Sequence, residues 1–343
     1  MFERSAMDWC RSSRFRLVAA WLAVTVAACS HDGAPTAAGT SQLSTIGTLG
    51  TDPAAVELSV SDITNFWAAY DAFAASKNVS TFQSQYLDRA SAGLVDFMRI
   101  RSVTAQSLAQ TVTAYPQYFA AIRPNMTSLA AGTLNAQIRA GFAKMKLVYA
   151  ATVFPTVTFL VGRFSTAGTI SNNRILIGTE FYSAGPGVPT GELGAFQQTN
   201  VKPQSWLPVV VAHEHVHILQ SRSGGIFGRS SLLEQALAEG SADFVGELAS
   251  GGNINAWIRD YALPREHELW VEFQAAMSGT DVSQWLYNQT GVASSRPGDL
   301  GYFMGYRIAE AYYLRAADKT QAVKDIIEMA NARTFLTASG YNP

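Results

Sequence analysis

Hydrophobic and polar positions follow a helical period through the first part of the chain. Behind Ser61 and Asp62, which are plausible helix caps, apolar side chains recur every three or four residues. A second apolar stripe runs from Leu134 to Tyr149 on the same spacing. Stripes of this kind are buried when a helix packs against a core. The pattern therefore predicts a helical layer over residues 57–150.

The pattern changes between residues 156 and 182. The segments 156–164 (TVTFLVGRF) and 174–182 (RILIGTEFY) are rich in β-branched and aromatic residues, and the intervening STAGTISNN consists of turn-forming residues. This predicts a strand, a loop and a second strand, most simply a β-hairpin over 156–182. Helical spacing returns over 200–343. The predicted fold class is therefore mainly α with a small β-sheet, an α+β arrangement.

The start of the chain has a pattern of its own. Arginines precede the apolar run Leu17–Cys29, which is too short to span a bilayer comfortably and is typical of a secretory signal. Its end, VAAC, resembles the cleavage box of bacterial lipoproteins, and this resemblance implies that Cys29 carries a lipid. Ser30 follows, which resembles the outer-membrane sorting pattern. A signal peptide that merely contains a cysteine is the alternative.

These patterns divide the chain into three expected segments. Residues 1–28 would be a lipoprotein signal peptide, and residues 29–55, which are small, polar and dotted with Gly and Pro, would be a flexible tether. Residues 56–343 would form the folded domain. The protein is expected to be anchored by lipid in the bacterial envelope, at the outer membrane, facing the periplasm or the outside.

Composition limits the partners and the ligands. The chain of 343 residues is 48% hydrophobic and 15% charged, with a formal net charge of −1. The sequence has no basic stripe of the kind that indicates nucleic-acid binding. The cysteines are Cys10 and Cys29. Removal of residues 1–28 would leave a domain without a disulfide or a thiolate ligand, so a metal would be held by histidines and carboxylates.

Candidate chemistry gathers in VVVAHEHVHILQ, residues 209–220. This stretch holds three of the five histidines of the chain. Pro208 near its start and Gly224 after its end bracket a helix. The predicted helix is apolar apart from the histidines, Glu214 and Gln220. A cluster of satisfied core histidines is the alternative to a metal site, although burial of an unpaired imidazole is costly.

Helical geometry assigns different roles to these side chains. His213 and His217 are four residues apart, so both rings face the same side and can bind one ion, as in the motif H-E-x-x-H. Glu214 projects about 100° further around the helix, where it can accept a proton from an attacking water. His215 points to the opposite side and is expected to pack or to form a hydrogen bond elsewhere.

The third ligand distinguishes the classes of zinc peptidase. Catalytic zinc keeps three protein ligands and one open position. The metzincin continuation fails, because Gln220 and Ser223 stand where that class has its Gly and His. A second helix pattern follows over residues 232–248. It contains three candidate carboxylate ligands, at Glu234, Glu239 and Glu247.

The sequence EGSAD within this second pattern resembles the gluzincin (thermolysin-like) arrangement. That resemblance implies a zincin-like core with Glu239 as the third zinc ligand and Asp243 as the hydrogen-bond acceptor for His213. Glu234 and Glu247 are more typical of capping or solvated charges. Gly240 in the middle of the helix costs about 1 kcal/mol relative to Ala, which a close approach between helices would justify.

A third helix pattern, residues 296–313, carries two tyrosines on one face. A tyrosine hydroxyl near the metal could donate a hydrogen bond to a developing oxyanion. Tyr306 is favoured for this role over Tyr302, with Arg307 and His267 as weaker candidates. An aromatic core helix is the alternative.

Taken with the zinc motif, the Gly-Tyr-x-x-Gly-Tyr helix resembles a family of bacterial predicted zinc-dependent proteases and the related gliding-motility lipoproteins. The resemblance implies a peptidase with one zinc per chain, a peptide or protein substrate and Glu214 as general base. The strand at 156–164 or that at 174–182 would be an exposed edge that pairs with the substrate. The alternatives are a non-catalytic envelope lipoprotein that binds partners and a chaperone-like protein with vestigial zinc.

Overall fold

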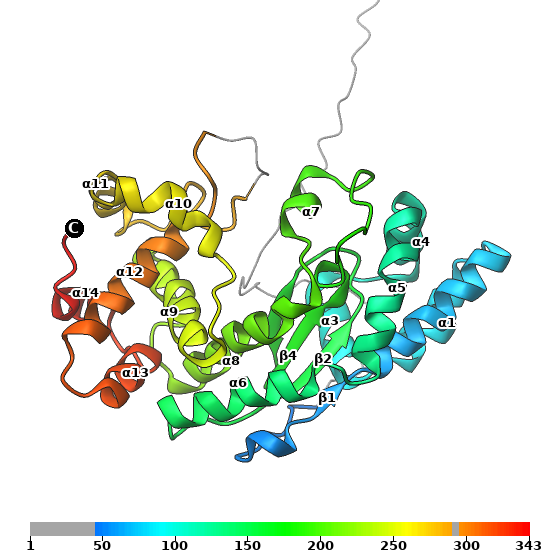
Figure 1. The fold of residues 1–343 in the computed structure, drawn as a ribbon, viewed down its shortest axis with the longest axis horizontal. Helices are drawn as coiled ribbons and strands as arrows, with labels where there is room; N and C mark the ends of the chain where they lie inside the picture. Colours follow the sequence, from blue (N-terminus) through cyan, green and yellow to red (C-terminus); the bar gives the residue numbers. More distant parts are fainter. Residues whose placement is uncertain (1–44, 290–294) are drawn as a thin grey trace, which may run out of the picture.

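The computed structural model describes residues 45–289 and 295–343. The predicted signal peptide and the lipidation site at Cys29 lie outside these residues. The described part is mainly helical with one small four-stranded sheet, which confirms the predicted fold class (Figure 1). Within these ranges, no helix is long and apolar enough to cross a membrane.

The first helical layer matches the predicted stripes. Its helices are α1 (Ser61–Ser76), α2 (Ser80–Gln85), α3 (Ala92–Arg101), α4 (Ala105–Ala114), α5 (Pro116–Ala130) and α6 (Asn135–Val148). Asp62 does not cap α1, contrary to expectation. It is buried and accepts hydrogen bonds from the backbone N–H and the hydroxyl of Ser91, at 3.0 and 2.5 Å. Ser91 is itself the N-cap of α3, so Asp62 joins α1 to the start of α3.

The sheet differs from the predicted hairpin. Its order is β1-β2-β4-β3, with β1 (Leu58–Ser59), β2 (Thr156–Leu160), β3 (Gly168–Ser171) and β4 (Arg174–Gly178). The two predicted strands pair in parallel rather than antiparallel, with Thr158 opposite Leu176. The hairpin is instead β3–β4, and its turn residues Asn172 and Asn173 have φ of 46° and 60°, as a tight hairpin turn requires. The turn-like stretch thus contains a strand.

This strand order also changes which edge is exposed. The strands β2 and β4 lie inside the sheet, so neither is the open edge that the sequence led us to expect. Their side chains are almost all buried, as is usual for parallel strands covered on both faces. The last strand at one side is β3, and α8 (Leu207–Ser223) packs against it and against β4.

The folded part begins before the expected boundary at residue 56. The backbone N–H of Gly47 donates to the carbonyl of Asn172 at 2.7 Å, and Gly50 forms an antiparallel bridge with Phe154. A short 3-10 turn over Pro53–Ala55 follows. Residues 47–55, assigned to the tether from composition, therefore contact the domain through backbone groups that composition does not reveal.

The described C-terminal part contains helices and no strand. After α7 (Ala195–Asn200) and α8 come α9 (Leu232–Ser250), α10 (Arg259–Ala262), α11 (Glu266–Ala276), α12 (Leu300–Arg315), α13 (Lys319–Ile327) and α14 (Ala332–Ser339). The helix α9 lies between α8 and α12 (Figure 1). A Cβ on Gly305 would lie 1.7 Å from the carbonyl oxygen of Ala236, and one on Gly240 would lie 2.1 Å from the backbone nitrogen of Tyr306. The close approach expected at Gly240 is therefore with α12.

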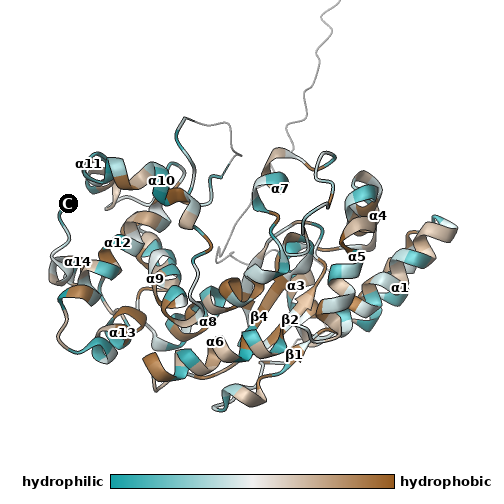
Figure 2. Ribbon diagram, in the orientation of Figure 1, coloured by the Kyte–Doolittle hydropathy of each residue, from teal (hydrophilic) through white to brown (hydrophobic). Residues whose placement is uncertain are grey.

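Two hydrophobic cores meet at α8. Val210 and Ile218 belong to the cluster around the sheet and α1–α6, whereas Val216 and Leu219 belong to the cluster among the C-terminal helices. Helices that are buried on all sides are apolar all round, and Figure 2 shows hydrophobic residues on α8 and on the strands beside it. The histidines of α8 are thus held in the middle of the molecule.

Candidate metal site

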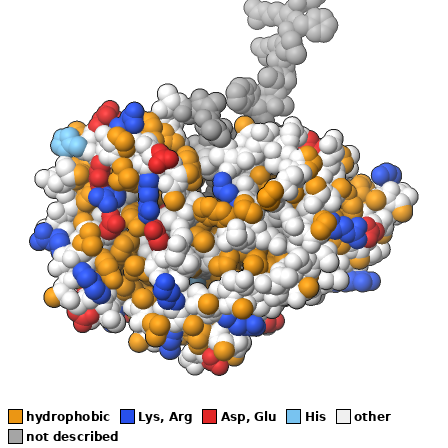
Figure 3. Space-filling view, viewed as in Figure 1, with side chains coloured by type: hydrophobic (Ala, Val, Ile, Leu, Met, Phe, Trp, Pro, Cys, Tyr) orange, Lys and Arg blue, Asp and Glu red, His pale blue; other side chains and the backbone are white. Residues whose placement is uncertain are grey.

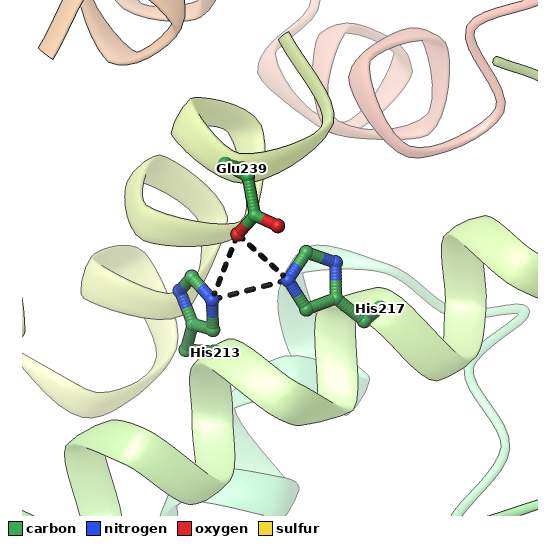
Figure 4. A group of neighbouring side chains, drawn as sticks. All are labelled: His213, His217 and Glu239. Atoms are coloured by element: carbon green, nitrogen blue, oxygen red, sulfur yellow. Dashed lines mark hydrogen bonds and ion pairs between the residues drawn. The ribbon is translucent and has the colours of Figure 1, made fainter. Parts of the chain in front are cut away.

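Three side chains from two helices meet at one point. His213 and His217 project from α8 on the same face, and Glu239 reaches them from α9 (Figure 4). The two Nε2 atoms are 3.1 Å apart, and Oε2 of Glu239 lies 3.5 Å from that of His213 and 3.2 Å from that of His217. All three side chains are buried.

The size of this triangle fits a zinc ion. Zinc binds imidazole nitrogen and carboxylate oxygen at about 2.0–2.1 Å in tetrahedral geometry, so neighbouring ligand atoms lie about 3.3 Å apart. The three measured separations run from 3.1 to 3.5 Å. The donor set of two imidazoles and one carboxylate also leaves a fourth position open, as in catalytic zinc sites.

The hydrogen bonds behind the rings determine which nitrogen carries the proton. Nδ1 of His213 faces Oδ1 of Asp243 at 2.8 Å, and Nδ1 of His217 faces Oε1 of Gln220 at 2.8 Å. The amide nitrogen of Gln220 donates to the carbonyl of Ala238 at 2.9 Å, so its oxygen is the atom turned toward His217. Each Nδ1 therefore donates, and in the neutral ring each Nε2 presents a lone pair to the centre.

The surrounding charges favour a cation at this centre. Burial disfavours the charged form of His213, but the carboxylates of Asp243 and Glu239 outweigh it and raise the pKa of His213 to about 10. Burial likewise opposes ionisation of Glu239, yet His217 and His213 hold the pKa of Glu239 at about 2. A site that stabilises positive charge on the rings to this extent also stabilises a bound metal cation.

Glu214 lies beside the three ligands and against the sheet edge. A Cβ on Gly168 would lie 2.5 Å from Oε1 of Glu214, so the carboxylate occupies the space that a side chain on β3 would fill. Burial raises the pKa of Glu214, and the neighbouring His213 and His217 offset part of that effect. A raised carboxyl pKa suits a group that accepts and then returns a proton near neutral pH.

The two tyrosines of α12 have different surroundings. The ring of Tyr302 stacks beside that of His213, with centroids 6.5 Å apart. Both residues line a pocket that opens beside the metal ligands. Tyr306 packs on Phe244 at 5.3 Å, and the guanidinium of Arg259 lies 4.6 Å from its ring centre. Tyr306 does not line that pocket, whereas Tyr302 does, so the role expected for Tyr306 stays a prediction.

The weaker candidates also lie elsewhere. Arg307 forms ion pairs with Glu266 and Glu310. His267 is exposed, and its Nδ1 lies 2.8 Å from the carbonyl of Pro343. Neither residue lines the pocket beside the three ligands.

The remaining carboxylates and the spare histidine have structural partners. Glu234 forms a capping box with Ser231 at the start of α9, and Glu247 pairs with Arg259 at 2.7 Å. His215 points away from the site, and its Nε2 lies 2.7 Å from the carbonyl of Val153. Burial lowers the pKa of His215 to about 4, so this ring stays neutral.

Tyr287 was not found from the sequence. Its hydroxyl donates to Oε1 of Glu239 at 2.9 Å, and its φ of 57° is unusual for an aromatic residue. The hydrogen bond holds the carboxylate so that Oε2 faces the histidines. Tyr287 lies outside regular structure and far along the chain from Glu239, and no local pattern predicts such a contact. Gln220 was likewise missed, although its position three residues after His217 on one helix face is a usable signal.

A pocket opens from this group to the surface. It is lined by Thr166, Ala167 and Gly168 at the start of β3, by His213 and Glu214, and by Tyr287 and Tyr302. Figure 3 shows the molecule hollowed between the sheet side and the C-terminal helices, with hydrophobic side chains gathered along the hollow. Gly168 of β3 and Glu214 therefore line a common space.

The site lies within a region that matches a known family. Residues 171–336, just under half of the chain, match the family described as "Predicted Zn-dependent protease (DUF2268)". This region includes α8, α9 and α12. Searches of curated proteins and of solved structures found no match. The similarity and the His-His-Glu group together support a zinc-dependent protease at a general level.

Proposed function

We propose that this chain is a zinc peptidase of the gluzincin type that holds one zinc ion through His213, His217 and Glu239. One observation carries the proposal. The Nε2 atoms of His213 and His217 and one carboxylate oxygen of Glu239 face one another within 3.5 Å in a buried site. When both rings are neutral, their lone pairs and the carboxylate repel one another, and a cation bound between them offsets that repulsion.

The chemistry follows from the residues around the ligands. Bound zinc supplies a Lewis acid that makes water a stronger nucleophile and polarises the peptide carbonyl. Glu214 accepts the proton of the attacking water and delivers it to the leaving amine nitrogen. Asp243 and Gln220 keep the two histidines in the tautomer that presents Nε2 to the metal. Tyr287 keeps Glu239 in its ligating orientation.

The substrate would bind along β3. An extended peptide can pair with the outer edge of this strand, which brings its backbone past Glu214. Tyr302 is the better placed of the two α12 tyrosines to donate a hydrogen bond to the oxyanion, because it lines the pocket and Tyr306 does not. We thus assign the role of oxyanion donor to Tyr302 instead of Tyr306. We assign the pairing with substrate to β3 instead of the inner strands β2 and β4.

The cellular setting is proposed from the sequence. A lipid on Cys29 would anchor the domain in the bacterial envelope, at the outer membrane. The substrate would be a peptide or protein. Labelling with a radioactive fatty acid, compared with a Cys29→Ser variant, tests the anchor. Label incorporated equally into both proteins would contradict it.

The first test of the function is the metal content of the purified chain. We expect about one zinc per wild-type chain and a marked loss in Glu239→Ala. Glu214→Gln should retain the zinc and lose peptidase activity by about 10²- to 10⁴-fold, since it removes only the proton acceptor. Retained activity in Glu214→Gln would contradict the mechanism. Full zinc content without cleavage of any peptide in a library would instead favour the partner-binding alternative.

A further inference from the structure

The pocket beside Glu214 combines an apolar wall with one lysine. Its apolar residues include Phe196, Trp206, Ile254 and Trp257. Among the described residues that line it, Lys202 is the only Lys or Arg. Lys202 follows α7, and Figure 1 shows α7 across from α10 and α12 of the C-terminal helices. A cation in apolar surroundings loses hydration, so its position needs a partner of opposite charge.

The backbone around Lys202 is fixed. Its N–H donates to the carbonyl of Phe181 at 2.7 Å, and its own carbonyl accepts from the N–H of Ala184 at 3.1 Å. Its Nζ donates to the carbonyl of Thr199 at 2.8 Å, at the end of α7. The lysine is therefore held at both its backbone and its ammonium group, rather than being free to swing into solvent.

Within the described residues, Lys202 has no ion-pair partner. Two half-buried arginines of the C-terminal helices differ in this respect, because Arg259 pairs with Glu247 and Arg307 pairs with Glu266, each at 2.7 Å. An ammonium has three N–H donors, and the carbonyl of Thr199 accepts one. Burial lowers the pKa of Lys202, with no nearby carboxylate to oppose the effect. The remaining donors can bind an anionic group of a ligand.

The pocket also contains acidic groups, and these are already engaged. Glu214 lies against Gly168 and the two histidines. Asp299 is nearly buried and accepts a hydrogen bond from the N–H of Asn288 at 3.1 Å. Neither forms an ion pair with Lys202.

We propose that Lys202 binds a carboxylate of the substrate while the apolar wall of the pocket takes a hydrophobic residue beside the cleaved bond. This inference rests on the proposed function and adds a substrate class to it. The carboxylate can be the free C-terminus, which would make the protein a carboxypeptidase. It can also be an Asp or Glu side chain, which would make the protein an endopeptidase that prefers acidic sequences.

Binding of small probes separates these sources without any cleavage. The probes are N-acetyl-phenylalanine, its C-terminal amide, and N-acetyl-phenylalanyl-aspartic acid α-amide, whose only carboxylate is on the side chain. Binding would be followed by the fluorescence of the pocket tryptophans Trp206 and Trp257. Each titration would be run with zinc and again after chelation, because a carboxylate that binds the metal directly loses affinity on chelation.

We expect the wild type to bind one of the two carboxylate probes about tenfold or more tightly than the uncharged amide, before and after chelation. Lys202→Gln should remove this preference, and Lys202→Arg should retain at least part of it. Lys144→Gln is the matched control, because it removes an exposed positive charge outside the pocket and should change nothing.

Preference for the free acid identifies a C-terminal carboxylate, and preference for the aspartyl probe identifies an acidic side chain. Equal binding of all three probes by the wild type would overturn the assignment, as would an undiminished preference in Lys202→Gln. If Lys202→Gln does not fold, the wild-type comparison and Lys202→Arg still decide the question. A carboxylate preference in a protein that binds no zinc would contradict the proposed function alone.

Discussion

His213 and His217 are held by partners of different charge. Behind His213 stands the carboxylate of Asp243, which also accepts a hydrogen bond from Asn255 at 2.9 Å. Behind His217 stands the neutral amide of Gln220. A carboxylate partner makes an imidazole a stronger metal ligand than an amide partner does. Asp243 should therefore matter more for metal affinity than Gln220.

The variant Asp243→Ala tests this difference. We expect its zinc affinity to fall about 10- to 100-fold, because the ring of His213 loses both its orientation and the negative charge behind it. Competition with a chelator of known affinity measures the change. His215→Gln is the control, since its amide nitrogen can still donate to the carbonyl of Val153 and the side chain lies on the far face of α8. Equal losses in both variants would contradict the assigned roles.

Between α8 and β3 the spacing is set by one glycine. The carboxylate of Glu214 fills the place of a side chain at Gly168, so the strand and the helix can approach only if that position has no Cβ. The same contact places Glu214 against β3, the last strand at that side of the sheet. The spacing of the two elements and the position of the proposed base therefore depend on the same atoms.

Gly168→Ala should uncouple catalysis from metal binding. The new Cβ would meet Oε1 of Glu214 at 2.5 Å, so the carboxylate must move while the metal ligands stay in place. We expect zinc to be retained and kcat to fall by about 10²-fold, as small displacements of a catalytic group cost that much. Gly141→Ala in α6 is the matched control, because nothing lies near its Cβ, and it should stabilise the fold by about 0.5–1 kcal/mol. An unchanged kcat in Gly168→Ala would contradict the proposed contact between the catalytic carboxylate of Glu214 and position 168.

Sequence reasoning succeeded where the determinants are local. Helical periodicity placed His213 and His217 on one face, and Pro208 and Gly224 bracket α8 as predicted. These features depend on residues within a few positions of one another.

It failed where the partners are distant in the chain. The parallel pairing of β2 with β4 and the contact of Tyr287 with Glu239 are set by tertiary packing, which a single sequence does not encode as a pattern. The predicted hairpin was wrong for a local reason. The whole stretch STAGTISNN was taken as a loop, but only Asn172 and Asn173 form the turn, and the residues just before them form β3. Tyr302 and Tyr306 could not be distinguished until the position of α12 along α9 was known.

Across the molecule, one buried carboxyl outside the metal site holds the loop that leads into β3. Oε1 of Glu180 accepts hydrogen bonds from the N–H groups of Gly162 and Phe164 at 2.9 and 2.8 Å, while its Oε2 is buried without a partner among the described residues. Arg163 and Phe164 have φ of 59° and 58°, so this loop needs support. Burial, opposed in part by these hydrogen bonds, raises the pKa of Glu180 to about 7.

This shift has a defined sign for the stability of the whole fold. Between an ordinary carboxyl pKa of 4.5 and the folded value of about 7, unfolding releases the proton of Glu180, so stability falls as pH rises through this window. The loss should be on the order of 3 kcal/mol, at about 1.4 kcal/mol per pKa unit. In Glu180→Gln the amide oxygen can still accept both N–H groups and does not titrate. Urea unfolding at pH 5 and pH 8 should therefore show a weaker pH dependence in this variant, and an equal dependence would contradict the assignment.

The position of α8 between the two hydrophobic cores has a consequence for how the molecule unfolds. Val210 and Ile218 are part of one core, and Val216 and Leu219 are part of the other. Neither core can open alone without exposing one side of this helix to water, so the cost of opening is shared. The described regions should therefore melt in a single cooperative transition, with no half-folded intermediate. Removal of a metal from α8 and α9 would lower the midpoint of that transition without splitting it in two.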